Sequence, residues 1–289
     1  MRSLRHTLAL CAVAVAAARP DPDCITYLFT FGNSYTSTGF NSSSTQPSVA
    51  NPMGNPVLGQ GTLAGGTNWV GYLTAFFNTS IVLNYNLAVS GATISNSLVN
   101  GVVGDFVYQV EFDFETHYVS KPASAPWNSS NAVFAFWIGI NDVGNSYKTK
   151  DPTAMVPELM DSYFRLVGEL YEWGARQFLF LNVPPTTRSP MIAAQNNTVA
   201  HAKYVDMYNR ELSARIGRFR QTYSEASAVE YDTWSFMSKV LEDPTRYGFQ
   251  NATCIGAGCV WWDNYHPTSA FHRLMAREMV PHLAVFNAW

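Results

Sequence analysis

The alternation of apolar, β-rich runs with helix-length amphipathic segments is the feature that most constrains the fold of this 289-residue chain. This alternation is typical of an α/β domain, and runs that are apolar almost throughout fit parallel strands covered on both faces. The predicted strands are 25–31, 83–88, 131–137, 177–182 and 228–231. The predicted helices are 69–77, 156–173, 200–223 and 269–286, the first capped by Asn68 and the last by Thr268. The order of the strands in the sheet does not follow from this pattern.

The N-terminus has the layout of a secretory signal peptide. Arg2 and Arg5 precede an apolar run at 8–15 and three alanines at 16–18, and the run is too short to span a bilayer. We expect residues 1–18 to be removed and the protein to be secreted and extracellular. No linker or internal repeat divides the remainder, so residues 19–289 are predicted to form a single catalytic domain.

Charge is scarce in this sequence. Charged residues make up 13 %, against roughly 25 % in an average protein, and the net charge is −3. Neither nucleic acid nor a membrane is therefore an expected partner, and we expect a monomer. Five Asn-x-Ser/Thr sequons could carry solubilising glycans, although chance also produces this tripeptide. The sequons begin at Asn41, Asn78, Asn128, Asn196 and Asn251.

Three cysteines remain after the predicted signal peptide. Cys254 and Cys259 flank a glycine-containing loop and could form a disulfide worth about 2 kcal/mol, which would pin the chain before Asp263 and His266. Cys24 is interpreted as a buried structural thiol. No His/Cys cluster has metal-ligand spacing, so neither a metal nor another cofactor is expected.

Three short polar blocks follow predicted strands. Ser34 comes after the first strand, Gly91 after the second and Asn141 after the third. In open α/β sheets, ligands bind beyond the carboxyl ends of the strands, where these residues would meet. The segment 41–67 is rich in Gly, Pro, Ser and Asn, and it is predicted to be a long loop that lines the resulting cleft.

These blocks and a fourth near the C-terminus offer the parts of a serine hydrolase. Ser34 would be the nucleophile, His266 the base and Asp263 the group that orients the imidazole. The backbone N–H groups of Ser34 and Gly91, with the amide of Asn141, would form the oxyanion hole. Taken singly, Ser34, Gly91 and Asn141 are at least as well explained as turn or cap residues. The Asp263-x-x-His266 pattern is more specific, although Asp263 could instead be a local turn acceptor. Their joint positions favour the catalytic interpretation.

The four blocks resemble those of the SGNH/GDSL hydrolase superfamily. The resemblance implies the same roles for these residues and a flavodoxin-like, three-layer α/β/α sandwich with a five-stranded parallel sheet. Most of the mature chain is similar to secreted fungal acetylesterases of carbohydrate esterase family 16, which remove acetyl groups from plant-cell-wall sugars, especially partly degraded hemicellulose. The segments that carry this closer resemblance are 31–36, 51–56, 134–142, 178–185 and 261–267.

The first block departs from the superfamily motif. Asn33 stands where the motif usually has Asp, and Tyr35 where it has Leu. Asparagine keeps an acceptor and nearly the same shape but loses the charge and gains donors. We expect the fold to tolerate this change, because this position is not the acid of the triad.

Aromatic residues beside the triad could stack against a sugar. Tyr35, Trp261 and Trp262 are the candidates, with one of the two tryptophans expected to touch the cleft; packing in the core is the alternative. Asp142 is interpreted as a hydrogen-bonding residue that holds the Asn141 loop rather than as a catalytic group.

The leading hypothesis is a metal-independent serine carboxylesterase that deacetylates hemicellulose oligosaccharides through an acyl-serine intermediate. A GDSL lipase or phospholipase that prefers longer acyl chains is one alternative. A carbohydrate-binding pseudoenzyme that has lost turnover through Asn33 is the other.

Overall fold

The computed structural model describes residues 21–289, so the predicted signal peptide and the side chain of Cys24 lie outside the described residues. The described chain forms a five-stranded, all-parallel sheet with the order β2-β1-β3-β4-β5. The strands are β1 Asp21–Gly32, β2 Ser80–Asn86, β3 Ala132–Trp137, β4 Gln177–Leu181 and β5 Ser227–Tyr231. The five predicted strands and the flavodoxin-like α/β/α architecture are confirmed.

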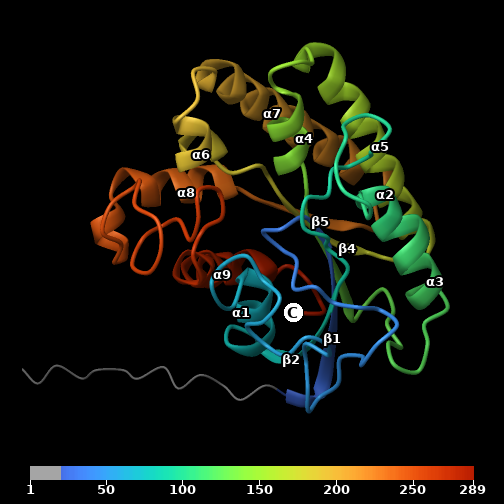
Figure 1. The fold of residues 1–289 in the computed structure, drawn as a ribbon. Helices are drawn as coiled ribbons and strands as arrows, with labels where there is room; N and C mark the ends of the chain where they lie inside the picture. Colours follow the sequence, from blue (N-terminus) through green and yellow to red (C-terminus); the bar gives the residue numbers. More distant parts are fainter. Residues whose placement is uncertain (1–20) are drawn as a thin grey trace, which may run out of the picture.

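Helices cover both faces of this sheet (Figure 1). Helices α1 and α9 pack together on one face, while α5, α7 and the segment from α2 to α3 cover the other. The longer helices are α1 Trp69–Ala75, α4 Ile140–Ser146, α5 Pro152–Glu172, α7 Thr198–Thr222, α8 Thr233–Glu242 and α9 Ser269–Leu283. The shorter ones are α2 Phe106–Tyr108, the π-helix η1 Gln109–Phe114, α3 Glu115–Tyr118, the 3₁₀ helix η2 Thr186–Arg188, α6 Pro190–Ala193 and the 3₁₀ helix η3 Pro244–Tyr247.

Phenylalanines in register hold the centre of the sheet. Phe29 of β1 lies opposite Phe134 of β3, and Phe136 of β3 lies opposite Phe180 of β4. The two pairs stack with ring centroids 5.1 and 5.3 Å apart, and all four rings are fully buried. Each aromatic pair adds about 0.5–1.5 kcal/mol beyond its burial. The apolar runs therefore form strands because both of their faces are covered.

The start of α5 shows the largest difference between a predicted and an observed helix boundary. The predicted start of α5 at residue 156 is wrong by four residues, because this helix begins at Pro152. Asp151 caps it by accepting a hydrogen bond from the N–H of Thr153 at 3.1 Å, and Pro152 occupies the first helical position. The predicted caps Asn68 and Thr268 both accept from the expected N–H groups of α1 and α9.

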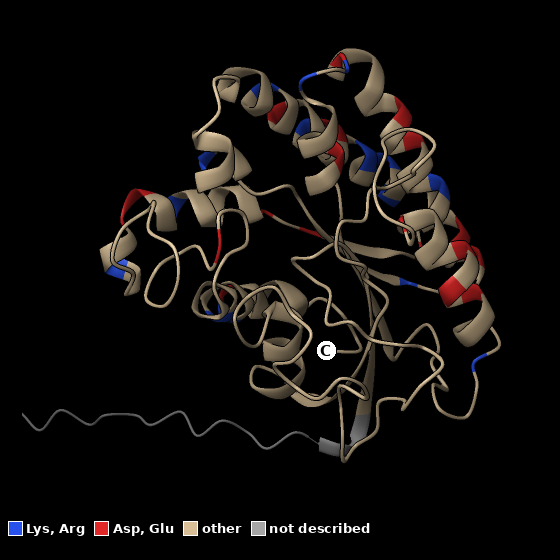
Figure 2. Cartoon of the chain, in the orientation of Figure 1, with Lys and Arg blue, Asp and Glu red and all other residues tan. Residues whose placement is uncertain are grey.

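A long uncharged stretch forms the part of the fold that carries Ser34. From residue 24 to residue 104 the sequence contains no Asp, Glu, Lys, Arg or His. This stretch includes most of β1, all of α1 and β2, and the predicted loop 41–67, which is irregular apart from one isolated bridge. Figure 2 shows the charged residues gathered mainly on the helices, with α5 and α7 prominent.

Candidate active site

The structure brings Ser34, His266 and Asp263 into one hydrogen-bonded array. His266 Nε2 lies 2.9 Å from Ser34 Oγ, and His266 Nδ1 lies 2.7 Å from Asp263 Oδ2. Ser34 has 8 % of its surface exposed, and the side chain of His266 has 16 %. A nucleophile contacting a base, which in turn contacts a carboxylate, is the geometry required for proton transfer from the serine.

The turn that presents Ser34 depends on the glycine before it. Gly32 ends β1 with φ +146°, and a Cβ there would lie 2.3 Å from the carbonyl oxygen of Trp137. Gln109 holds this glycine from both sides: its Oε1 accepts from the N–H of Gly32 at 2.8 Å, and its Nε2 donates to the carbonyl at 2.9 Å. The sequence analysis missed Gln109, because nothing local marks a glutamine that bonds a residue 77 positions away.

Asn33 leaves one buried donor without an acceptor among the described residues. Its side chain is fully buried, and its Oδ1 accepts from the N–H of Tyr35 at 3.1 Å. Its Nδ2 has no partner in the described part of the chain. The acceptor that the motif aspartate would supply is thus kept, at the cost of an unsatisfied amide.

The Asp263 carboxylate organises the loop that carries His266. Besides contacting the ring, it accepts at Oδ1 from the backbone N–H groups of Tyr265 and His266, both at 2.7 Å. Partial burial raises the pKa of Asp263, but these two N–H bonds and the bond from the His266 ring outweigh burial, and the net pKa is lowered. The carboxylate is therefore held in its ionised form beside the imidazole.

Tyr35 supports this loop and does not face the solvent. Its hydroxyl donates to the carbonyl of Tyr265, and its ring lies 5.5 Å from the ring of His266. Only 1 % of its surface is exposed. The prediction that Tyr35 stacks against a sugar is wrong, since its ring is packed between β3, the His266 loop and α9.

The two tryptophans beside Asp263 differ in exposure. Trp261 is fully buried and donates its indole N–H to the carbonyl of Ala252 at 2.9 Å, so its proposed contact with substrate is wrong. Trp262 is 42 % exposed. Its ring lies against Gly65 of the long loop, where a Cβ would fall 2.4 Å from the indole. Trp262 is therefore the tryptophan that remains available to a ligand.

The two further predicted oxyanion donors lie on connected segments. Gly91 has φ +83°, and its N–H has no acceptor among the described residues; the same is true of the N–H of Ser34. Asn141, at the start of α4, donates one amide hydrogen to the carbonyl of Ala92 at 2.8 Å. The second hydrogen of this amide remains for a ligand.

Asp142 joins these segments. Both of its oxygens accept from the N–H of Ile94, at 3.0 and 3.2 Å, and its side chain is fully buried. Burial raises its pKa to about 7, partly offset by the bond from Ile94. These contacts agree with the interpretation of Asp142 as the residue that holds the Asn141 turn.

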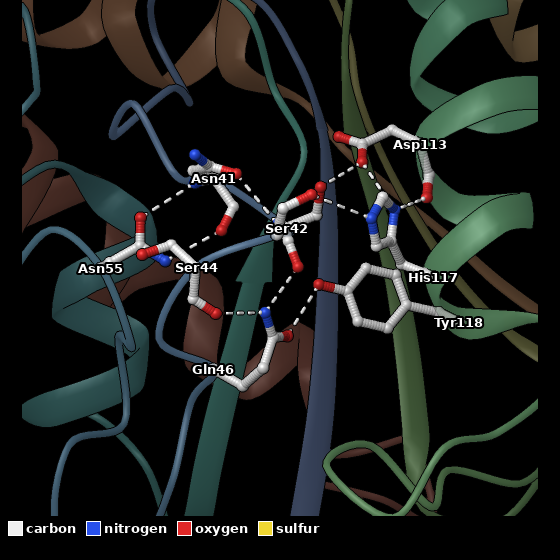
Figure 3. A network of polar contacts seen from close by, with 9 residues as sticks. Asn41, Ser42, Ser44, Gln46, Asn55, Asp113, His117 and Tyr118 are labelled. Carbon is white, nitrogen blue, oxygen red and sulfur yellow. Dashed lines mark hydrogen bonds and ion pairs between the residues drawn. The ribbon is translucent and has the colours of Figure 1, made fainter.

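Part of the long loop is anchored by a second polar cluster (Figure 3). Ser42 donates to Asp113, Ser43 Oγ lies 3.3 Å from His117 Nε2, and Tyr118 donates to the Gln46 side chain at 2.9 Å. These bonds attach the loop to the π-helix and to α3. The loop is thus held in place before its continuation reaches Gly65.

The C-terminal loop contains a disulfide between Cys254 and Cys259. It closes a short loop a few residues before Asp263, with Gly256 donating to the carbonyl of Trp261 at 2.8 Å. Of the five sequon asparagines, Asn78 is half-buried and donates to the carbonyl of Ser80 at 2.7 Å. The other four are exposed: Asn41, Asn128, Asn196 and Asn251.

The triad does not line the open pocket of about 500 Å³ between α7 and α8, whose lining includes Asn209 and Trp234. Over residues 21–289, no group of three or more His, Cys, Asp or Glu side chains is arranged to hold a metal ion. None of the described helices combines the length and apolar character needed to cross a bilayer.

A Ser–His–Asp array beside amide donors at the carboxyl edge of a parallel sheet is the arrangement of a serine hydrolase. The chain belongs to the GDSL-like lipase/acylhydrolase family, whose model matches residues 28–279, and it is a carboxylic ester hydrolase. A protein named acetylesterase from Thermothelomyces thermophilus is 41 % identical over 98 % of this chain and 95 % of its own length.

Solved structures agree on the fold. An acetylxylan esterase from Geobacillus stearothermophilus superimposes with a TM-score of 0.52 at 18 % identity, over 89 % of this chain and 94 % of that one. An alpha/beta hydrolase enzyme from the metagenome of Lake Arreo, Spain, gives 0.50 at 16 % identity, over 91 % and 95 %. At these identities the likeness extends to the fold alone.

Proposed function

We propose that the chain is a secreted acetylesterase that removes acetyl groups from plant-cell-wall carbohydrate, such as hemicellulose oligosaccharides. The contacts of His266 with Ser34 and Asp263, at 2.9 and 2.7 Å, carry the proposal. The 41 % identical acetylesterase supports the acetyl group as the substrate's acyl part. The active protein would be a monomeric glycoprotein with one domain, 19–289, formed after removal of a signal peptide at 1–18.

In the first half of the reaction, Ser34 Oγ attacks the acetyl carbonyl carbon while His266 Nε2 takes its proton. Asp263 stabilises the imidazolium by accepting from Nδ1–H. The carbonyl oxygen becomes negative and accepts hydrogen bonds from the N–H groups of Ser34 and Gly91 and from the amide of Asn141. The bond to the sugar oxygen then breaks, and that oxygen takes the proton from His266.

In the second half, His266 removes a proton from water as the water oxygen attacks the acetyl-serine carbonyl. The tetrahedral intermediate collapses, the bond to Ser34 Oγ breaks, and Oγ regains the proton from His266. Acetic acid leaves and loses its remaining proton to the solvent, and the array returns to its starting state. In both halves of the cycle His266 first accepts a proton and then returns it, so it acts as a general base and then as a general acid.

The uncharged stretch 24–104 supports a neutral carbohydrate as the substrate. It supplies Ser34, Gly91 and the long loop without a single ionisable Asp, Glu, Lys, Arg or His. A surface without charges gives no attraction to ionic substrates and leaves polar uncharged groups for hydroxyls. The 42 % exposed ring of Trp262 would provide an apolar platform beside Asp263 for a sugar face.

The test measures acetate release from 4-nitrophenyl acetate and from acetylated xylo-oligosaccharides. The wild type should hydrolyse both, and Ser34→Ala should hydrolyse neither. Ser43→Ala is a matched control, because Ser43 also contacts a histidine, His117 at 3.3 Å, away from the proposed site. Its activity should equal that of the wild type. Equal rates for Ser34→Ala and the wild type would refute the assignment.

Two results would redirect the substrate class. A wild type that prefers long acyl chains over acetate would favour a lipase, and sugar binding without hydrolysis or labelling of Ser34 would favour a pseudoenzyme. Secretion is tested separately by expressing the full chain in a eukaryotic host. The mature N-terminus should then lie near residue 19, and enzymatic removal of N-glycans should lower the mass.

A further inference from the structure

Val102 packs against the glycine that we place in the oxyanion hole. A Cβ on Gly91 would lie 2.8 Å from one methyl group of Val102 and 3.4 Å from the other. These distances leave no room for even one added carbon. The methyl groups of Val102 therefore cover the side of Gly91 from which a side chain would project.

The loop that carries Val102, residues 95–104, is held by Asn96. Its Nδ2 donates to the carbonyl of Val102 at 2.8 Å, and its Oδ1 accepts from the N–H of Gly101 at 2.9 Å. Its backbone N–H donates to Asp105 at 2.7 Å. Asn145 of α4 also donates to the carbonyl of Asn100 at 2.9 Å. Val102 is thus fixed by bonds at several points along its loop.

This loop is joined to the nucleophile turn by Gln109. The same Nε2 that donates to Gly32 also donates to the carbonyl of Gly104, at 3.1 Å. The segment before Gly91 is bonded to the same turn, because the N–H of Val89 donates to the carbonyl of Gly32 at 3.1 Å. Val102 therefore belongs to the hydrogen-bonded unit that positions both Ser34 and Gly91.

Val102 retains an exposed apolar surface in this position. It is 41 % exposed, and the adjacent Val103 is 90 % exposed. During the reaction the sugar oxygen must face His266, which protonates it. The acyl group is bonded to the same carbonyl carbon as the oxyanion, so its first carbon lies next to the groups that surround the oxyanion donors, and Val102 is one of these groups. A valine is restricted at χ1, so its methyl groups form a fixed boundary there.

We infer that Val102 limits the length of the acyl group that the site accepts. An acetyl methyl fits in front of the methyl groups of Val102, whereas a longer acyl chain must displace the Val102 side chain. This inference rests on the proposed function, because it takes Gly91 as an oxyanion donor. A single methylene changes selectivity by about 10- to 200-fold in an apolar pocket.

The experiment compares kcat/KM for 4-nitrophenyl acetate and 4-nitrophenyl butyrate in the wild type, Val102→Ala and Val103→Ala. Val102→Ala should raise the butyrate-to-acetate ratio about tenfold. Val103→Ala, a matched change at a more exposed neighbour, should leave the ratio unchanged. A ratio in Val102→Ala equal to that in Val103→Ala would overturn the inference.

Val102→Ile provides a second measurement if Val102→Ala fails to fold. The extra methylene should lower the butyrate-to-acetate ratio, and an unaltered ratio would also overturn the inference. This failure differs from failure of the proposed function. If hydrolysis depends on Ser34 but the butyrate-to-acetate ratio is unaltered in the Val102 variants, only the role of Val102 is refuted. If hydrolysis persists in Ser34→Ala, the proposed function is refuted.

Discussion

The backbone N–H of Ile94 donates to both carboxylate oxygens of Asp142, at 3.0 and 3.2 Å. This contact joins the segment after Gly91 to the turn that carries Asn141, so two proposed oxyanion donors share one anchor. The anchor is a fully buried acid, and burial raises its pKa to about 7. Ionisation of Asp142 therefore opposes folding at neutral pH.

Asp142→Asn should change how stability depends on pH. In the unfolded chain this carboxyl ionises near pH 4, and in the folded protein near pH 7, so the wild type loses stability between these values as pH rises. Asparagine keeps an acceptor for Ile94 and stays neutral. The free energy of unfolding of the variant, relative to the wild type, should increase from about pH 4 to about pH 8 in urea titrations. A constant difference would contradict this role.

Asp263→Asn should lower kcat by about 10⁴-fold, because an amide donor facing Nδ1 selects the wrong tautomer of His266. Asp243→Asn is the control, since Asp243 is exposed and also accepts a turn N–H, that of Arg246 at 3.3 Å. It should keep full activity. Both variants are assayed on a short ester after their thermal unfolding is checked, and a kcat within about tenfold of wild type in Asp263→Asn would exclude the triad role.

Asn141→Ala should lower kcat and kcat/KM by the same factor, about 10² to 10³, because the lost amide acts on the developing oxyanion. Its bond to the carbonyl of Ala92 is lost as well, so thermal unfolding is measured alongside. A raised KM with unchanged kcat would instead indicate a role in ground-state binding.

Asn33 variants separate the acceptor from the charge at the motif position. Asn33→Asp keeps the acceptor for the N–H of Tyr35 and removes the unpartnered buried Nδ2, so activity should persist. Asn33→Ala removes the acceptor and should lower the free energy of unfolding by about 1–3 kcal/mol. Urea unfolding and ester hydrolysis of both variants check this, and an Asn33→Ala protein as stable as wild type would show that the bond contributes nothing.

The strands could be predicted because burial on both faces is visible in local composition. All six residues of β3 are buried, and their sequence is apolar throughout. Strand order and the short helices around residues 106–118 could not be predicted, because they depend on contacts between distant segments. The start of α5 could have been predicted from Asp151 and Pro152, which are a local signal for a helix start. The prediction followed the apolar pattern instead and placed the start at residue 156.

In the site, too, the features that local sequence patterns indicate could be predicted, and those that depend on contacts between distant segments could not. Ser34, Gly91 and Asn141 each follow a strand, and Asp263 is three residues from His266, so local patterns and family blocks pointed to them. The substrate roles given to Tyr35 and Trp261 failed because exposure is a property of packing. The hydroxyl of Tyr35 donates to the carbonyl of Tyr265, 230 positions away, and no local pattern indicates this contact.

Covalent labelling tests the central claim, that Ser34 is the nucleophile. The wild type is incubated with a fluorophosphonate, which reacts with activated serines, and the modified peptide is identified by mass spectrometry. The account predicts one modified residue, Ser34, and no labelling in Ser34→Ala or His266→Ala. A label on another serine, or ester hydrolysis that continues with Ser34 unmodified and unreactive, would contradict it.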